Sequence, residues 1–139
     1  MANLTPNLHN MEKFTRIYTE RRTCLKYDEG NVIGYLNEVV IPEFVPEYEG
    51  TEDAAPTPTV GYSYTGTERD GGTIMPCSDP KDYGQLTNAI IRASLSESDE
   101  LAIQRHYNND PVEYADEWHK YNELCENAKL QAKMWLNIE

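Results

Sequence analysis

The sequence predicts an α+β fold in which short antiparallel β-hairpins are followed by a three-helix C-terminal unit that ends in a long helix. Short runs of β-branched and aromatic residues, separated by glycine-containing turns, fill the first half of the chain. The second half instead repeats apolar residues at helical spacing. We therefore expect a β-hairpin region over residues 1–76 and a helical region over residues 77–139.

The first hairpin is expected over residues 24–36. Two apolar runs, 24–27 and 32–36, flank Gly30-Asn31, residue types that accept the positive φ of a tight turn. Residues 38–41 are expected to prolong or follow the second strand. Upstream, residues 14–18 are predicted as a strand, although a helical reading stays open because several apolar residues fit that spacing with Asn10 as cap: Met11, Phe14, Ile17 and Tyr18.

An acidic, proline-rich loop is expected over residues 42–59. No basic residue occurs between Lys26 and Arg69, whereas acidic residues accumulate there and prolines stand at positions 42, 46, 56 and 58. This composition is typical of an extended, solvated connector. After it, a second hairpin is predicted from strands over 60–65 and 73–75, with Asp-Gly-Gly at 70–72 as the turn.

The first two helices of the C-terminal region each have a start signal. Residues 78–80 (Ser-Asp-Pro) are expected to cap a helix over 80–94. Its apolar stripe consists of Tyr83, Leu86, Ile90 and Ala93. Ser96, with Asp99 three residues on, predicts a second short helix that ends near Tyr107.

The last helix carries a seam of residues at alternating spacings of 4 and 3. Asp110 is expected to cap it and Pro111 to take its first position, for a length of about 26 residues. A free-standing coiled coil is not expected, because the seam lacks the Leu and Ile of a zipper. The seam residues are Tyr114, Trp118, Tyr121, Cys125, Ala128, Ala132 and Trp135.

Two interpretations of the seam stay open. It covers the chain's own helices, or it docks on another subunit through aromatic residues, which are the types enriched at interface centres. The second interpretation makes four aromatic residues the candidate partner interface: Tyr114, Trp118, Tyr121 and Trp135.

Charge and hydropathy argue against several functional classes. The net charge is −12, from 24 acidic and 12 basic residues, and Arg21-Arg22 is the only adjacent basic pair, so nucleic-acid binding is not expected. No run approaches the ~18 apolar residues of a membrane span. The N-terminal residues lack the apolar core of a signal peptide, so we expect reduced cysteines and no glycan at Asn3.

Catalytic signals are weak throughout. Asp116 and His119 stand three residues apart on the last helix, with Glu123 one turn on, but a metal site in a helical bundle needs further carboxylates from facing helices. We therefore expect no enzyme activity, no cofactor and no metal. Two alternatives stay open: an acidic inhibitor or DNA mimic, and a small metal-dependent enzyme.

The helical region resembles a known family. Residues 83–92 (YGQLTNAIIR), followed by Leu95-Ser96 and residues 100–103, are similar to a phrase of phage and prophage tail-associated proteins, Y-x-x-L-(V/T)-x-x-(L/I)-I-R-x-x-Y-(S/T). The last helix matches that family at Glu113, Tyr114, Trp118, Tyr121, Cys125 and residues 128–133, and residues 64–73 are similar to its preceding β module. Ser94-Leu95 departs from the pattern, where an aromatic residue more often precedes the Ser.

The resemblance covers roughly half to two-thirds of the chain. It implies a tail or tail-fibre accessory protein, either a virion component or an assembly factor, that contacts other tail proteins or its own copies. It also implies a location in the cytoplasm of a bacterial host or in the virion. The resemblance implies no catalytic residue.

Overall fold

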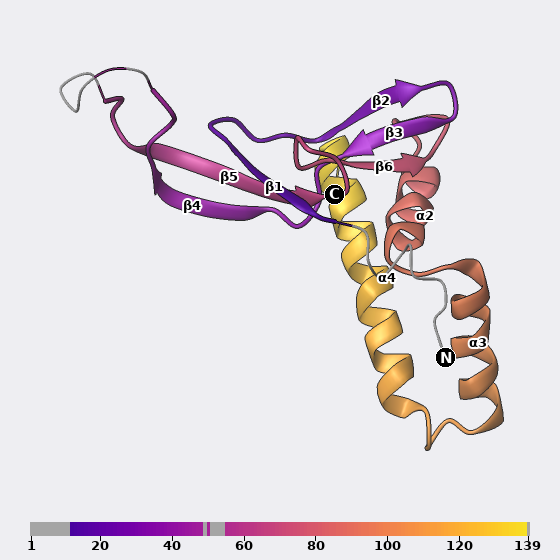
Figure 1. Cartoon of the computed structure of the whole chain (residues 1–139). Helices are drawn as coiled ribbons and strands as arrows, with labels where there is room; N and C mark the ends of the chain where they lie inside the picture. The colour runs from indigo at the N-terminus through magenta and orange to yellow at the C-terminus, as the bar shows by residue number, and fades with distance from the viewer. Residues whose placement is uncertain (1–11, 49, 51–54, 139) are drawn as a thin grey trace. The chain divides into compact units, whose positions relative to one another are not determined.

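The computed structural model describes residues 12–48, 50 and 55–138 (Figure 1). Within the described residues the strands precede the helices, which confirms the α+β prediction. The chain forms two compact units: the first combines Met1–Cys24 with Ile33–Ile74, and the second combines Leu25–Val32 with Met75–Glu139. The expected division after residue 76 stays a prediction, and Asn3 lies outside the described residues.

The first unit contains an antiparallel sheet with the strand order β1-β5-β4. Its strands are β1 (Phe14–Tyr18), β5 (Thr59–Gly66) and β4 (Val39–Phe44), so strand 14–18 is confirmed over its helical alternative. In β1, Ile17 lies opposite Ser63, and in β4, Ile41 lies opposite Gly61. Because side chains of opposed residues share a face, Ile17 and Ile41 lie on the same face of the sheet.

The acidic loop closes a hairpin instead of linking two hairpins. Figure 1 shows β4 and β5 side by side, joined by residues 45–58, of which 49 and 51–54 lie outside the described residues. The loop therefore begins later than expected, because β4 continues through Pro42. Proline is tolerated there because β4 is an edge strand whose register shifts between Ile41 and Phe44.

The predicted second hairpin is wrong. β6 (Thr73–Pro76) belongs to a second sheet with the order β2-β3-β6. The physical reason is that β5 already has β1 on one edge and β4 on the other, so neither edge is left for β6. The turn itself exists, because the Glu68 amide donates to the Gly72 carbonyl at 2.9 Å and the Gly71 amide donates to the Glu68 carbonyl at 3.0 Å.

The first predicted hairpin is confirmed by β2 (Cys24–Asp28) and β3 (Asn31–Gly34), which are neighbours in the second sheet. Its turn uses different chemistry from that expected. The described glycines with positive φ are Gly50 and Gly71, so Gly30 does not adopt the left-handed conformation that was expected of this turn. Instead, the Asp28 carboxylate accepts hydrogen bonds from the Gly30 amide at 3.0 Å and from the Asn31 side chain at 2.9 Å.

Tyrosines form the core of the first unit. Tyr64 is fully buried and Tyr35 nearly so, and their rings meet edge to face with centroids 5.7 Å apart. The Arg22 guanidinium lies 4.7 Å from the Tyr18 ring and 4.8 Å from the Tyr35 ring. A cation held between two aromatic faces is attracted to the ring quadrupoles, so this residue adds to the packing.

The second unit packs α2 (Tyr83–Ser94) against α4 (Ala115–Leu136). α4 presents two fully covered alanines, Ala128 and Ala132, which let the helices approach closely. The expected apolar stripe of α2 is wrong at Ala93, which is exposed. The buried residues of α2 are Leu86, Ala89, Ile90 and Ile91.

Two of the expected helix starts are wrong by several residues. α2 begins at Tyr83 because the Asp82 carboxylate accepts from the Gln85 amide at 3.0 Å, so the cap follows Pro80. Asp110 caps a separate turn by accepting from the Glu113 amide at 3.0 Å, and α4 starts after it with Tyr114 as an N-cap that makes no side-chain capping bond.

The start of α3 (Glu97–Asn109) matches its prediction. The Ser96 hydroxyl accepts from the Asp99 amide at 3.1 Å, as an N-cap does. The helix continues two residues past Tyr107, and the Asp110 amide closes it on the His106 carbonyl at 2.9 Å.

Candidate protein-binding site

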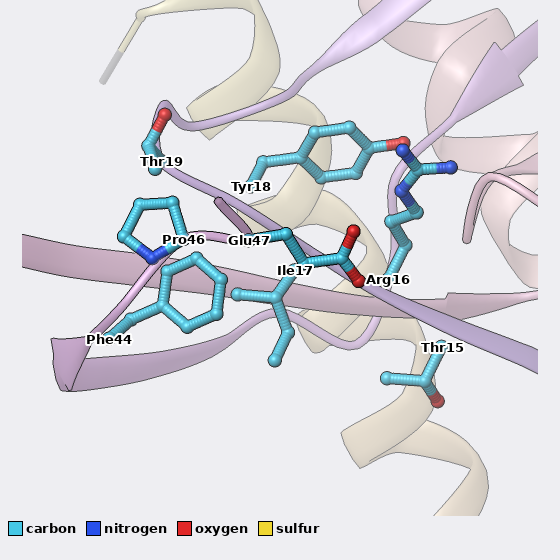
Figure 2. A pocket seen from close by; sticks show the side chains of 8 residues that line it. All are labelled: Thr15, Arg16, Ile17, Tyr18, Thr19, Phe44, Pro46 and Glu47. Atoms are coloured by element: carbon cyan, nitrogen blue, oxygen red, sulfur yellow. The ribbon is translucent and has the colours of Figure 1, made fainter. Parts of the chain in front are cut away.

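A groove of about 710 Å³ lies along β1 in the first unit (Figure 2). Five of its lining residues are consecutive, from Thr15 to Thr19, and the opposite wall comes from Phe44, Pro46 and Glu47. Consecutive residues of a strand point to alternating faces. Because Ile17 of β1 and Phe44 of β4 meet over Gly61 of the central strand, the groove runs along the side of β1 that faces β5 and β4.

The edge of β1 is suited to contact by another chain. β1 is the terminal strand of the sheet, so one of its edges has no pairing strand within the described residues. It contains no proline, and the side chains of Thr15 and Arg16 are exposed. The other terminal strand, β4, is interrupted by Pro42 and by its register shift. Of the two edges, β1 offers the longer regular row of backbone groups.

Gly61 shapes the wall of the groove. A Cβ atom at Gly61 would lie 2.8 Å from Cβ of Phe44 and 3.0 Å from Cγ2 of Ile17. These distances are below van der Waals contact, so only glycine lets both side chains meet over the central strand. Figure 2 shows the Phe44 ring and the Ile17 side chain next to each other in the groove.

Exposed apolar side chains continue from the groove over the β4–β5 hairpin. Val39 is 59% exposed and Val40 is 49% exposed, and both belong to β4. Further exposed members of this set are Val45, Tyr48 and Val60. Other exposed large apolar residues lie on β2, on α3, and on or beside α4, so the relevance of these five rests on their place next to the groove and not on exposure alone.

The C-terminal end of β1, at Tyr18, is fixed by a hydrogen-bond network. The Tyr18 hydroxyl donates to the Asp70 carbonyl at 2.5 Å, and the Tyr35 hydroxyl donates to the Asp70 carboxylate at 2.7 Å. The Arg22 guanidinium donates to the Tyr35 hydroxyl at 3.1 Å. Burial alone would raise the pKa of Asp70, but the bonds from Tyr35 and the Gly72 amide, with Arg22 nearby, keep it below its ordinary value.

A second branch of the network ties Tyr64 to the segment after β1. Its hydroxyl accepts from the Arg22 amide at 2.9 Å and donates to the Glu38 carboxylate at 2.8 Å, which also accepts from Arg21 at 3.1 Å. Burial raises the pKa of Tyr64 to about 12, so this hydroxyl stays protonated at neutral pH. The network therefore holds the end of β1 in place.

Three of the four predicted interface residues contact α3. The Trp118 ring stacks on Tyr107 with centroids 4.4 Å apart, and the Tyr114 ring stacks on His106 at 4.5 Å. Tyr121 donates its hydroxyl to Glu100. All three are half-buried, as is Trp135 near the other end of α4. The geometry agrees with the interpretation in which the seam covers the chain's own helices, and partner binding by these residues stays a prediction.

Glu100 links the three helices of the second unit. Its carboxylate accepts from Tyr121 of α4 and is paired with Arg92 of α2. The bond from Tyr121 and the ion pair with Arg92 hold the pKa of Glu100 below its ordinary value of 4.5, against the opposing effect of burial. Burial and the same carboxylate raise the pKa of Tyr121.

Acid is therefore expected to loosen this helix junction. Because the pKa of Glu100 is lowered on folding, its stabilising effect is present above the ordinary value of 4.5 and is lost as pH falls through the folded value. Unfolding in urea, followed by circular dichroism from about pH 6 to about pH 3, should show a smaller loss of stability for Glu100→Gln than for the wild type. Glu97→Gln, at an exposed carboxylate 4.0 Å from Arg92, is the control and should keep the wild-type slope.

The residues considered for metal binding lie on the surface of α4. His119 pairs with Glu123 at 2.8 Å, and both side chains are exposed. Within residues 12–48, 50 and 55–138, no three His, Cys, Asp or Glu side chains are grouped so that they could hold a metal ion. Burial raises the pKa of the Cys77 thiol, whose sulfur donates to the Asp79 carbonyl at 3.3 Å.

No protein-family model, curated protein or solved structure matches the chain. Among the helices of the described ranges, none is both long enough and apolar enough to cross a membrane.

Sequence reasoning missed the groove, because it joins residues 15–19 to residues 44–47. The residue that could have indicated the groove is Gly61, because a glycine inside a strand often lets other side chains approach the backbone closely.

Proposed function

We propose that this protein is a non-enzymatic binding module with a structural or assembly role, which docks another protein along the groove of β1. The observation that carries the proposal is the run of five consecutive edge-strand residues in the lining of one groove. A volume of about 710 Å³ would also suit a small molecule. Small-molecule sites, however, enclose their ligand and converge a few polar groups on it, whereas this groove runs along the length of β1.

The apolar surface next to the groove supports the same function. Phe44 and Ile17 supply an anchor site, and the exposed valines of β4 extend the contact area along the hairpin. Aromatic and aliphatic residues with well-packed surroundings carry most of the energy at protein interfaces. A partner that covered this surface would remove the apolar exposure noted above.

Phe44→Ala is expected to weaken partner capture by roughly ten-fold or more, as removal of a central anchor does. The measurement is affinity capture from an extract of the cells in which the protein is made, with quantification of each retained protein. Val112→Ala is the matched control, because Val112 is 87% exposed and lies in the other unit. It should retain every partner.

The Phe44 variant also loses contacts inside the sheet, so its free energy of unfolding is measured in parallel. Thr19→Glu provides a second test, since Thr19 lines the groove with an exposed side chain and carries little of the packing. Undiminished capture by both folded variants would contradict the proposal.

The setting proposed for this role is the tail of a bacterial virus or prophage, supported by the resemblance of residues 83–103 and 113–133 to tail-associated proteins. The expected partner is then another tail protein. Co-purification of the two from a lysate of phage-producing cells tests the setting. If all proteins retained through the groove were unrelated host proteins, the setting would be wrong while the binding role would stand.

A further inference from the structure

The outer edge of β1, on the side of the strand away from β5, is a second surface of the first unit. We propose that this edge binds an extended, mostly uncharged segment of another protein, with one carboxylate placed opposite Arg16. The segment would join the sheet as a fourth strand. The groove lies on the other side of β1, so this inference goes beyond docking at the groove and does not depend on it.

The backbone of β1 leaves a row of polar groups without a strand partner. β1 spans Phe14–Tyr18 and is terminal in its sheet. In an antiparallel pair, every second residue turns both its N–H and its C=O away from the neighbouring strand. Within the described residues, no turn, loop or capping bond between backbone groups involves residues 14–18. An added strand satisfies such groups, whereas a helix makes its own backbone bonds internally.

The regularity of β1 sets the length of the segment. Its five residues pair one to one with β5, from Phe14 opposite Gly66 to Tyr18 opposite Tyr62. A strand rises ~3.3 Å per residue, so the regular edge is about 17 Å long. We therefore expect the bound part of the partner to contain about five extended residues.

The side chains of β1 set the alternation of the segment. Phe14, Arg16 and Tyr18 share one face of the strand, and Thr15 and Ile17 share the other. Residues that lie opposite each other on neighbouring strands also share a face and contact each other. We therefore expect β-branched or aliphatic residues along the segment, except at the position opposite Arg16.

Arg16 sets the charge at that central position. Its side chain is exposed, and it is the one charged residue of β1. Its guanidinium lies 5.8 Å from the centre of the Tyr18 ring, and none of the ion pairs among the described residues includes it. Opposite charges that face each other across a strand pair stabilise the pairing. A carboxylate opposite Arg16 would supply the ion pair that this residue lacks within the described ranges.

The ends of β1 give no comparable preference. Before the strand, Glu12 is followed by Lys13, and after it, Glu20 is followed by Arg21. Each end therefore has one charge of either sign. A carboxylate of the partner is favoured at the centre, where Arg16 has no acidic neighbour in the strand.

A second copy of the chain fits this edge less well. Pairing of two β1 edges would bring two strands together that each carry Arg16, on proteins with a net charge of −12 each. Like charges oppose association. A short segment with a single carboxylate avoids both repulsions.

The experiment uses the 139-residue chain and three peptides, Thr-Val-Thr-Xaa-Thr-Val-Thr, in which the central residue is Glu, Gln or Lys. Each carries a dye without net charge, and binding is followed by fluorescence anisotropy at low salt. The Glu peptide should bind with a dissociation constant of about 0.05–1 mM. The Lys peptide should bind roughly five-fold more weakly or less well still, and the Gln peptide should lie between them.

A charge reversal places the peptide opposite Arg16. Arg16→Glu should reverse the preference, so that the Lys peptide binds more tightly than the Glu peptide. Arg105→Glu, at an exposed arginine of α3, is the matched control and should keep the wild-type preference. A purely structural role of Arg16 would lower all affinities together and would not reverse their order.

Two N-methylated forms of the Glu peptide test the backbone pairing. Methylation of alternate residues removes either the amides that face β1 or the amides that face away from it. One form should therefore lose binding while the other keeps it. Glu47→Gln changes the groove and not the outer edge, so it should leave the affinity unchanged.

Four results would overturn the proposal. They are no binding of the Glu peptide at about 5 mM, an unreversed preference in Arg16→Glu, equal binding of the two N-methylated forms, and a changed affinity in Glu47→Gln, which would place the peptide in the groove. Dimerisation of the protein that competes with the peptide would assign the edge to a second copy and would also overturn it. Partner capture by Phe44→Ala reports on the groove alone, so the two proposals can fail separately.

Discussion

Gly66→Ala is expected to lower the free energy of unfolding by about 3 kcal/mol or more, at the upper end of the range for overpacked positions. A Cβ atom at Gly66 would lie 2.3 Å from the Gly72 carbonyl oxygen, 2.6 Å from its carbonyl carbon and 2.5 Å from the Thr73 hydroxyl. Two of these atoms belong to the backbone, so no side-chain rotation relieves the clash. The end of β5 and residues 72–73 would have to separate. Urea unfolding measures the effect.

Gly30→Ala is the matched control, because a Cβ atom there meets nothing within 4 Å and Gly30 is not among the described glycines with positive φ. It should change the free energy of unfolding by no more than about 0.5 kcal/mol. If Gly66→Ala and Gly30→Ala proved equally stable, the close approach of residues 66 and 72 would be wrong.

Leu86→Ala is expected to destabilise the helical unit by about 2–5 kcal/mol. Leu86 is fully buried on α2, and α2 packs against α4, whose buried residues are Ala128 and Ala132. The buried residues of α4 are alanines, which have no side-chain rotamers with which to fill the cavity. We expect thermal unfolding, followed by helical circular dichroism, to move to a clearly lower temperature.

Leu130→Ala serves as the control for this second substitution, since Leu130 lies on α4 and is 62% exposed. The same chemical change at that position should cost less than about 1 kcal/mol. Similar losses for the two variants would mean that the α2–α4 contact does not carry the stability of the unit.

Local signals predicted the elements whose formation depends on neighbours in sequence. Ser96 fixes the start of α3 because its hydroxyl needs only the amide of Asp99. The hairpin of β2 and β3 likewise follows from two apolar runs and a short turn. The seam correctly predicted the covered side of the last helix, because every seam residue is buried or half-buried in the structure.

Strand pairing and the groove could not be predicted in the same way. β5 has the same local signals whether it pairs with β6 or lies between β1 and β4, and only the competition for its two edges decides. The groove depends on the contact of Phe44 and Ile17 across Gly61, which joins three separate segments of the chain. The aromatic residues of the seam were predicted as a candidate partner interface, because the sequence does not show which residues of α3 they contact. In the structure, Trp118 contacts Tyr107 and Tyr121 contacts Glu100.

The unpaired edge of β1 also has a consequence for the solubility of the protein. An open strand edge can nucleate cross-β aggregation, and proteins commonly block such edges with bulges, prolines or charge. β4 has Pro42 and a register shift, whereas β1 has neither and carries one charged residue, the exposed Arg16. The charge of Arg16 and the net charge of −12 on each copy are then what oppose pairing of identical edges. Self-association at this edge is therefore expected to increase as salt screens the net charge of the protein.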